Sequence, residues 1–346
     1  MKILLTSYVF APSIGGIETV SALLAPEFVR AGHEVKLVTK TATEDSVSRP
    51  YEVIRNPSPS RFMELTRWCD VFFQNNISLE MAWPLLFIRR PWVVSHHTWL
   101  DLASTWKVQM KKRLLRFARH AAISRPIADS LSVPSTLVGN PYDPETFHLW
   151  PGIERDRELV YLGRLVSDKG IDLLVDALAE LRQRGLTPRL SIIGAGPELY
   201  ALRERAERLQ VSSQIEFVGS KTGLELAKML NAHLVMVIPS RWAEPFGVVA
   251  LEGIACGCVI VASQNGGLLE AVGPCGRMVE TGNLADLTHA LQELLMRPQL
   301  HQELLREAPQ HLAQFTPGHV ASLYLNLFSE AMQKQKPSHS LFDKAR

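Results

Sequence analysis

The sequence predicts an α/β protein built from two Rossmann-like, doubly wound domains. Short apolar runs alternate with helical segments along nearly the whole chain, which is typical of parallel sheets covered by helices. The length of 346 residues suits two domains of ordinary size, and a proline-rich stretch at 140–152 separates two alternating series. We therefore expect domains at 1–147 and 148–317, followed by a helix and a disordered tail within 318–346.

The first half should begin with a buried strand at 2–7, after which a helix runs to about residue 31. The opening residues are too few for the apolar core of a signal peptide, so we assign them to this strand. Further strands of this half are expected at 34–39, 51–55, 70–74, 92–95, 121–124 and 136–139.

The second half repeats the architecture of the first without repeating its sequence. Its strands are expected at 159–163, 189–193, 214–218, 233–239, 259–262 and 276–279. Its helices are expected at 170–184, 284–296 and 299–312, with a last helix at 318–333.

The stretch 244–270 follows a buried strand and carries the densest set of polar groups beside apolar runs. Pro245 suits the first turn of a helix, which Gly257 should end. A loop and helix N-terminus in this position face the crevice where open α/β sheets bind ligands. Glu244 and Glu252 would then lie roughly 9 Å apart along the helix axis, close to the span from a ribose to a sugar across a diphosphate. Other binding groups expected here are the free backbone amides of Phe246, Gly247 and Val248.

These residues resemble the donor site of GT-B glycosyltransferases of the GT4 kind. The resemblance rests on the E-x7-E spacing, the F-G after the first Glu, the A-C-G, and the G-G-x-x-E that follows, and it extends over nearly the whole chain. It implies two domains facing a central cleft, an acceptor site in the first, a nucleotide-sugar site in the second, and a last helix that crosses back to the first. It also implies retention of anomeric configuration. Leu268 and Leu269 stand where the family usually has a proline, which leaves the donor sugar open.

A loop after the first strand of the second half carries two cations five residues apart, Arg164 and Lys169. A nucleotide-sugar gains negative charge on its outer phosphate as the sugar departs, so its site needs fixed cations or a metal. The sequence has no D-x-D metal clamp, whereas a guanidinium and an ammonium can hold phosphate oxygens. The resemblance places the diphosphate on this pair, although an ordinary surface Arg and Lys remain the alternative. We expect no metal and no other cofactor.

Two features of the first half complete the expected donor site. Gly15 and Gly16, between the first strand and first helix, allow backbone amides to approach a phosphate or sugar, although a plain tight turn is the alternative. Their spacing is not the G-x-G-x-x-G of dinucleotide-binding proteins.

In the family a histidine at the end of the 92–95 strand lies beside the donor's sugar and phosphate. The threonine that follows aligns His97 with it better than His96, which stays the alternative.

The segment from Trp106 to His120 holds six Lys or Arg and no acid. A basic amphipathic helix between Lys107 and Arg119 suggests an anionic membrane surface, and a solvated helix face is the alternative. Trp92, Trp99 and Trp106 are expected to be exposed beside it. We therefore expect a lipid-linked or envelope-glycan acceptor, as in polysaccharide biosynthesis, and a cytoplasmic protein that is peripheral on the inner face of the membrane. No nucleic-acid partner is expected.

The four cysteines form no C-x-x-C pair and should be buried reduced thiols: Cys69, Cys256, Cys258 and Cys275.

Three other functions fit parts of the sequence. A nucleotide-sugar epimerase or a phosphorylase could use the same architecture, and an epimerase would convert the donor without an acceptor. An NAD-dependent oxidoreductase is disfavoured because neither first loop has the required glycine spacing. A non-catalytic membrane or glycan scaffold would have no reason to combine Arg164, Lys169, Glu244 and Glu252. The leading hypothesis is transfer of a hexose, with the donor phosphate accepting the acceptor's proton.

Overall fold

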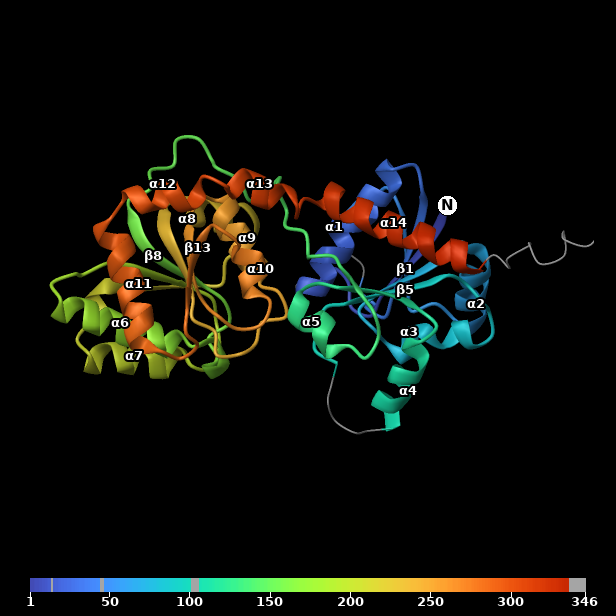
Figure 1. The fold of residues 1–346 in the computed structure, drawn as a ribbon, viewed down its shortest axis with the longest axis horizontal. Coiled ribbons are helices and arrows are strands. Elements are labelled where there is room, and N and C mark those ends of the chain that lie inside the picture. The colour runs from blue at the N-terminus through green and yellow to red at the C-terminus, as the bar shows by residue number, and fades with distance from the viewer. Residues whose placement is uncertain (14, 44–46, 101–105, 336–346) are drawn as a thin grey trace, which may run out of the picture. The chain divides into compact units, whose positions relative to one another are not determined.

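The computed structural model describes residues 1–13, 15–43, 47–100 and 106–335, and Figure 1 shows its fold. The chain divides into two compact units. The first unit combines the chain up to Pro141 with the chain from Pro317 onward, and the second unit is Tyr142–Thr316. The unit boundaries therefore lie at 141/142 and 316/317, where the sequence analysis placed them at 147/148 and 317/318.

The first unit is built on a seven-stranded parallel sheet with strand order β3-β2-β1-β4-β5-β6-β7. The predicted strands of this half are present, and no strand end shifts by more than two residues. Their bounds are β1 (Lys2–Ser7), β2 (Glu34–Thr39), β3 (Glu52–Arg55), β4 (Val71–Asn75), β5 (Trp92–His96), β6 (Arg119–Ala122) and β7 (Thr136–Leu137). The helices are α1 (Gly16–Arg30), α2 (Pro59–Trp68), α3 (Leu79–Ala82), the 3₁₀ helix Trp83–Leu86, α4 (Trp106–Leu115), α5 (Arg125–Ser130) and α14 (Pro317–Gln335).

Side chains alternate between the two faces of this sheet, as the pleat of a strand requires. One face packs against α1 and α14, which lie side by side in Figure 1, in a core that includes Leu5, Phe73 and Phe328. The other face packs in a second core around Phe62 of α2 and Phe72 of β4. The last helix of the chain is therefore part of the first unit's core.

The second unit is built on a six-stranded parallel sheet with strand order β10-β9-β8-β11-β12-β13. The direction of the order reverses between β8 and β11, and the loops after these two strands lie at the switch point where such sheets bind ligands. The strands are β8 (Arg157–Leu162), β9 (Leu190–Ile193), β10 (Ile215–Gly219), β11 (His233–Ile238), β12 (Val259–Ser263) and β13 (Gly276–Val279). The helices are α6 (Ile171–Gln183), α7 (Leu199–Arg208), α8 (Gly223–Asn231), α9 (Val248–Ala255), α10 (Leu268–Val272), α11 (Leu284–Met296), α12 (Gln299–Leu305) and α13 (Ala308–Ala313), with 3₁₀ turns at Ser167–Lys169 and Ser212–Gln214.

Two predictions about helices in the second unit are wrong. Helix α9 begins at Val248 behind a left-handed Gly247 with φ 100°, so Pro245 lies in the preceding loop. The estimate of a helical rise between Glu244 and Glu252 therefore does not apply, because only Glu252 is helical. The single helix expected at 299–312 is also divided into α12 and α13.

Two predictions about the basic segment of the first unit also need correction. Helix α4 ends at Leu115, and Arg119 and His120 belong to β6, because the apolar run that follows them pairs with β5. Trp92 is only 6% exposed, since it lies in β5 and joins the core around Phe72. The predicted exposure of Trp106 falls outside the side chains that the structure describes, and Trp99 is half-buried.

No helix within the described part of the chain is both long enough and apolar enough to cross a membrane.

Candidate active site

Lys169 and Glu244 meet where the two switch-point loops of the second unit come together. The Lys169 ammonium donates to Glu244 Oε1 at 2.5 Å, and the Ser240 hydroxyl donates to the same oxygen at 2.9 Å. The two charged side chains are 20% and 16% exposed. Two groups predicted from different loops thus form one partly buried ion pair.

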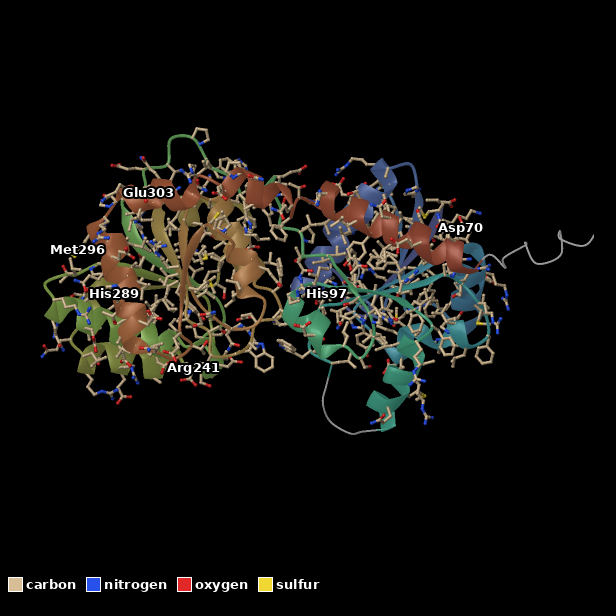
Figure 2. All side chains as sticks on the ribbon, viewed as in Figure 1. Asp70, His97, Arg241, His289, Met296 and Glu303 are labelled. Carbon is tan, nitrogen blue, oxygen red and sulfur yellow. The ribbon has the colours of Figure 1, made fainter. Side chains whose placement is uncertain are left out.

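The backbone locks these two loops together. The carbonyl of Asp168 accepts hydrogen bonds from the amides of Arg241 and Trp242, at 2.8 and 2.9 Å. The Arg241 guanidinium, labelled in Figure 2, also donates to both carboxylate oxygens of Asp172, at 2.6 and 2.9 Å. Burial opposes ionisation of Asp172, but this guanidinium outweighs it and lowers the pKa of that carboxyl. Sequence reasoning missed Arg241 and Asp172, which are far apart in the chain.

Arg164 lies on the same loop as Lys169. Its side chain is exposed and makes no hydrogen bond or ion pair with any residue that the structure describes. Its carbonyl accepts the hydroxyl of buried Tyr161 at 2.9 Å. Burial raises the pKa of Tyr161, and the negative charges of Glu244 and Asp168 raise it further, whereas Arg164 lowers it. These three charged groups therefore lie around one buried tyrosine, which sequence reasoning also missed.

Glu252 is the fifth residue of α9 and is half-buried. Burial, and secondly the negative charge of Asp143, raise the pKa of Glu252 to about 7. Among the described residues its carboxylate has no hydrogen-bond partner. A carboxylate in this condition gains stability from any ligand hydroxyl that can donate to it.

The N-terminus of α9 is shaped by glycines. Gly247 has φ 100°, and a Cβ there would lie 2.5 Å from Leu268 Cδ2. Gly266 has φ 62°, and a Cβ there would overlap the carbonyl oxygen of Glu244, which also accepts the Gly267 amide at 2.7 Å. The G-G pair of the motif thus holds the backbone of Glu244. The Phe246 side chain is buried, with its ring 5.5 Å from the Phe315 ring between centroids.

The glycine pair of the first unit lies at the start of α1. Gly15 precedes the helix in an extended conformation that any residue can adopt, with φ −178°. A Cβ at Gly15 would lie 2.6 Å from a carboxylate oxygen of Glu18, whereas a Cβ at Gly16 would meet nothing. A flexible acidic side chain therefore lies beside the helix N-terminus.

The two adjacent histidines point to opposite faces of the first sheet. His96 Nε2 lies 3.1 Å from His120 Nδ1, and His120 Nε2 lies 2.7 Å from the Leu115 carbonyl. His97, which is labelled in Figure 2, contacts Ser95 instead: its Nε2 atom lies 2.8 Å from Ser95 Oγ. Burial lowers the pKa of His96 to about 3 and that of His97 to about 4, so both rings are neutral near pH 7.

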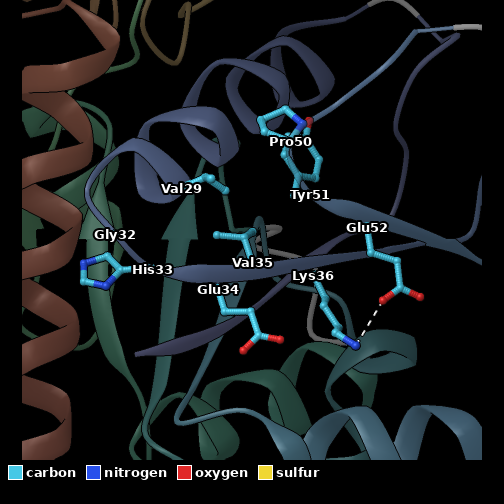
Figure 3. Close-up of a pocket in the computed structure, with 9 residues that line it drawn as sticks. All are labelled: Val29, Gly32, His33, Glu34, Val35, Lys36, Pro50, Tyr51 and Glu52. Atoms are coloured by element: carbon cyan, nitrogen blue, oxygen red, sulfur yellow. Dashed lines mark ion pairs between the residues drawn. The ribbon is translucent and has the colours of Figure 1, made fainter.

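A pocket of about 570 Å³ in the first unit lies apart from these residues. Figure 3 shows it at the amino ends of β2 and β3, where Lys36 and Glu52 form an ion pair at 3.0 Å. No residue predicted for the site lines this pocket. The predicted residues of the first unit follow the carboxyl ends of β1 and β5, at the opposite edge of the sheet.

Nothing in the described ranges groups three or more His, Cys, Asp or Glu side chains so that they could hold a metal ion. The four cysteines are buried and form no disulfide.

Residues 149–311 match the protein family described as glycosyl transferases group 1. The match lies within the second unit, apart from its first seven and last five residues. The chain is also 32% identical over 194 residues to a D-inositol 3-phosphate glycosyltransferase of Gordonia bronchialis. That alignment covers 53% of this chain and 42% of the relative, so the chain spans less than half of that protein's length. A glycogen synthase of Mycobacterium tuberculosis is 28% identical over 90% of both chains.

The solved structures extend the likeness from the matched region to the whole fold. HepE of Anabaena, solved in complex with UDP, aligns with a TM-score of 0.78 at 20% identity, over 95% of this chain and 100% of that one. At this identity the likeness concerns the fold alone. It confirms the predicted class, two Rossmann-like α/β domains of the GT-B type.

Proposed function

We propose that the protein is a glycosyltransferase of the GT4 kind that moves a hexose from a nucleotide-sugar to an acceptor, with retention of configuration and without a metal. The observation that carries this proposal is the partly buried Lys169–Glu244 pair on the two switch-point loops, with Arg164 exposed on one of them and unpaired among the described residues. These loops lie within the region that matches the group 1 family. Such an arrangement supplies fixed positive charge next to a carboxylate that accepts hydroxyl groups.

Each group has a role in this reaction. Arg164 and Lys169 hold the diphosphate, and the ammonium has three protons, so it can keep Glu244 while donating to phosphate oxygen. Glu244 accepts sugar hydroxyls and Glu252 accepts the ribose diol. The amides of residues 246–248 contact sugar or phosphate from the start of α9. For Gly15, Gly16 and His97, contact with the donor stays a prediction from the sequence.

The bond between the anomeric carbon and the diphosphate oxygen breaks while the acceptor oxygen bonds to the same carbon from the same face. The electron pair stays on the leaving phosphate, whose charge Arg164 and Lys169 stabilise. The acceptor's proton passes to an oxygen of that phosphate, so no enzymatic base is needed. A covalent glycosyl-enzyme trapped at any carboxylate would overturn this front-face course.

The decisive test is a thermal-shift screen of the full chain against UDP-, GDP-, ADP- and CMP-sugars, because a ligand that binds only the folded state raises the melting temperature. UDP-sugars are the first choice, since HepE has been solved with UDP-glucose. At least one donor should raise the melting temperature of the wild type, and Lys169→Ala should abolish the rise. Turnover of the bound donor should require an acceptor. Absence of a shift with every donor, conversion of donor alone, or binding of NAD would each contradict the proposal.

We also propose that the acceptor is a lipid-linked or envelope glycan, reached from the cytoplasmic face of the membrane. This rests on the basic segment between Lys107 and Arg119, where Arg113 is exposed and Phe117 is 79% exposed. The side chains at 106–108, 111 and 112 lie outside the described residues. Replacing Lys111, Lys112 and Arg113 by Glu should abolish binding to vesicles that contain an anionic lipid. Unchanged binding would contradict the membrane proposal and leave the transferase proposal intact.

A further inference from the structure

A chain of buried hydroxyl groups ends at the ring of His97. The Tyr324 hydroxyl of α14 lies 2.6 Å from Ser95 Oγ of β5, and this oxygen lies 2.8 Å from His97 Nε2. The three residues are 1%, 0% and 5% exposed. The Tyr324 hydroxyl is therefore linked to the His97 ring through Ser95 Oγ, while the Tyr324 ring packs against Phe73 at 4.9 Å between centroids.

The directions of these two hydrogen bonds follow from the number of protons. Within the described residues Ser95 Oγ is the sole hydrogen-bond partner of the Tyr324 hydroxyl, and a buried hydroxyl that donates to nothing is unfavourable. Tyr324 therefore donates to Ser95. Ser95 can then donate its single hydroxyl proton only to His97 Nε2, so this nitrogen must be an unprotonated acceptor. A neutral ring with a bare Nε2 carries its proton on Nδ1.

The other ring nitrogen faces a second buried group. His97 Nδ1 and Asn140 Oδ1 are both inaccessible to solvent and lack a hydrogen bond to any described residue. The Asn140 side chain nevertheless raises the pKa of His97 against the larger effect of burial. An N–H directed at a carbonyl oxygen explains this sign, because such an oxygen stabilises the protonated ring. This agrees with the proton position deduced from the hydroxyl chain.

We propose that Tyr324, acting through Ser95, is a positioning residue that fixes His97 as the neutral Nδ1–H tautomer directed at Asn140. Both ring nitrogens are then turned to the protein interior, and His97 neither gives a proton to the ligand nor takes one from it. The role of this ring in transfer rests on the proposed function, whereas the tautomer does not. Asn140 lies just before the point where the chain leaves the first unit, and Tyr324 lies on α14, with which the chain returns to that unit. The proposed network therefore links residues of both segments to His97.

The tautomer is tested by NMR of the full chain with ¹⁵N-labelled histidine rings, the His97 signals being assigned by their loss in His97→Gln. We expect a protonated Nδ1 and an unprotonated Nε2 in the wild type. Tyr324→Phe keeps the ring but removes the donor, so Ser95 can accept as well as donate, and a mixture of tautomers should appear. Ser95→Ala should give a similar mixture. The matched control is Ser329→Ala on the same helix, because the one hydrogen bond of the Ser329 hydroxyl to a described residue goes to the Leu325 carbonyl of that helix. An Nε2–H tautomer in the wild type, or an unchanged Nδ1–H tautomer in both variants, would overturn the proposal.

Kinetics provide the second measurement. Tyr324→Phe should lower kcat/KM roughly 3- to 10-fold, the effect of one neutral hydrogen bond, while Ser329→Ala leaves it unchanged. The donor-induced thermal shift should persist in Tyr324→Phe, since Lys169, Glu244 and Glu252 belong to the other unit. A wild-type chain without transferase activity would contradict the proposed function, and the NMR result would still decide the tautomer. A normal kcat/KM in a variant with mixed tautomers would refute the positioning role.

Discussion

At the scale of single residues, the candidate site depends on charges that partly cancel in the absence of a ligand. Lys169 and Glu244 neutralise each other in a partly buried position, whereas Arg164 is exposed and Glu252 has no hydrogen-bond partner among the described residues. A bound diphosphate would add the negative charge that this set lacks. The affinity of the site for a diphosphate therefore depends on whether each of these groups keeps its charge.

Replacing Glu244 by Gln tests the charge of the ion pair. The amide keeps the shape and can still accept from Ser240, but Lys169 loses its charged partner. We expect kcat/KM to fall at least about tenfold, since hydrogen bonds to charged groups contribute roughly 1.5–3 kcal/mol. The control is Glu225→Gln, which removes an ion pair with Lys221 at the protein surface and should leave kcat/KM unchanged. Equal kinetics for the two variants would refute the assigned role.

The raised pKa of Glu252 predicts a pH-dependent stability. Its folded pKa, about 7, exceeds the ordinary value of 4.5. Its contribution to stability is therefore complete below the unfolded pKa and is lost as the pH rises through about 7. Glu252→Gln should melt about 2–6 °C above the wild type near pH 8.5 and level with it near pH 5. Exposed Glu303→Gln is the control, and a difference that does not vary with pH would contradict the pKa assignment.

The same titration should govern ligand binding. Only the ionised form of Glu252 is a full acceptor for a ribose diol, so nucleotide affinity should rise between about pH 6 and about pH 8. Isothermal titration across this range should show the rise in the wild type and its absence in Glu252→Gln. A wild-type affinity that falls with pH would exclude the ribose role.

At this scale the sequence predicted the groups that the proposed reaction uses, but not the groups that contact them in the structure. Arg164, Lys169, Glu244 and Glu252 stand out because of their spacing within a recognisable motif. Tyr161 gives no such signal, because a tyrosine in an apolar strand looks like any core residue. The partners of His97 are also unreadable, since Ser95 and Tyr324 are 229 positions apart in the chain.

At the scale of elements, the loop after β8 is held against the loop after β11 by a glycine. Gly170 has φ 65°, and a Cβ there would overlap the carbonyl oxygen of Pro239. Because a backbone oxygen cannot rotate away as a side chain can, the two loops can approach this closely only at glycine. The approach is what brings Lys169 to Glu244.

Gly170→Ala should therefore separate Lys169 from Glu244. We expect a loss of stability about 1–3 kcal/mol larger than that of Gly185→Ala, together with loss of the donor-induced thermal shift. Gly185 follows the other end of the same helix, has φ 81°, and has nothing near its Cβ position. The Gly185→Ala variant therefore measures only the free-energy cost of placing an alanine in the left-handed conformation. Equal melting temperatures for the two variants would show that the overlap is relieved elsewhere.

Element positions were well predicted where the hydrophobic period was clear, as in α11 and the central strands. The start of α9 was not, because Pro245 is equally suited to a first turn and to a loop, and the left-handed Gly247 decides between them. The end of α4 was missed because a basic run looks the same in a helix as in the turn and strand that follow it.

At the scale of the whole molecule, the two units differ in how the chain builds them. The second unit is continuous, whereas the first needs α14, which contributes Val320, Tyr324 and Phe328 to its core. The charged groups assigned to the donor, at 164, 169, 244 and 252, all lie in the continuous unit.

A fragment of residues 142–316 should therefore fold alone and retain the donor-induced thermal shift. A fragment of residues 1–141 should lack a cooperative melting transition until residues 317–335 are joined to it, since it would expose the face that α14 covers. Calorimetry of the separate fragments checks both statements. Cooperative melting of 1–141 by itself would show that α14 contributes little to that core.

The position of α14 also affects how the protein emerges from the ribosome. Residues 142–316 have all their strands and helices as soon as residue 316 leaves the exit tunnel, whereas the first sheet, translated earlier, still lacks one covering helix. During that interval Leu5 and Phe73 face no helix at the place that Phe328 will occupy. The half of the protein that is translated first is therefore the half that matures last.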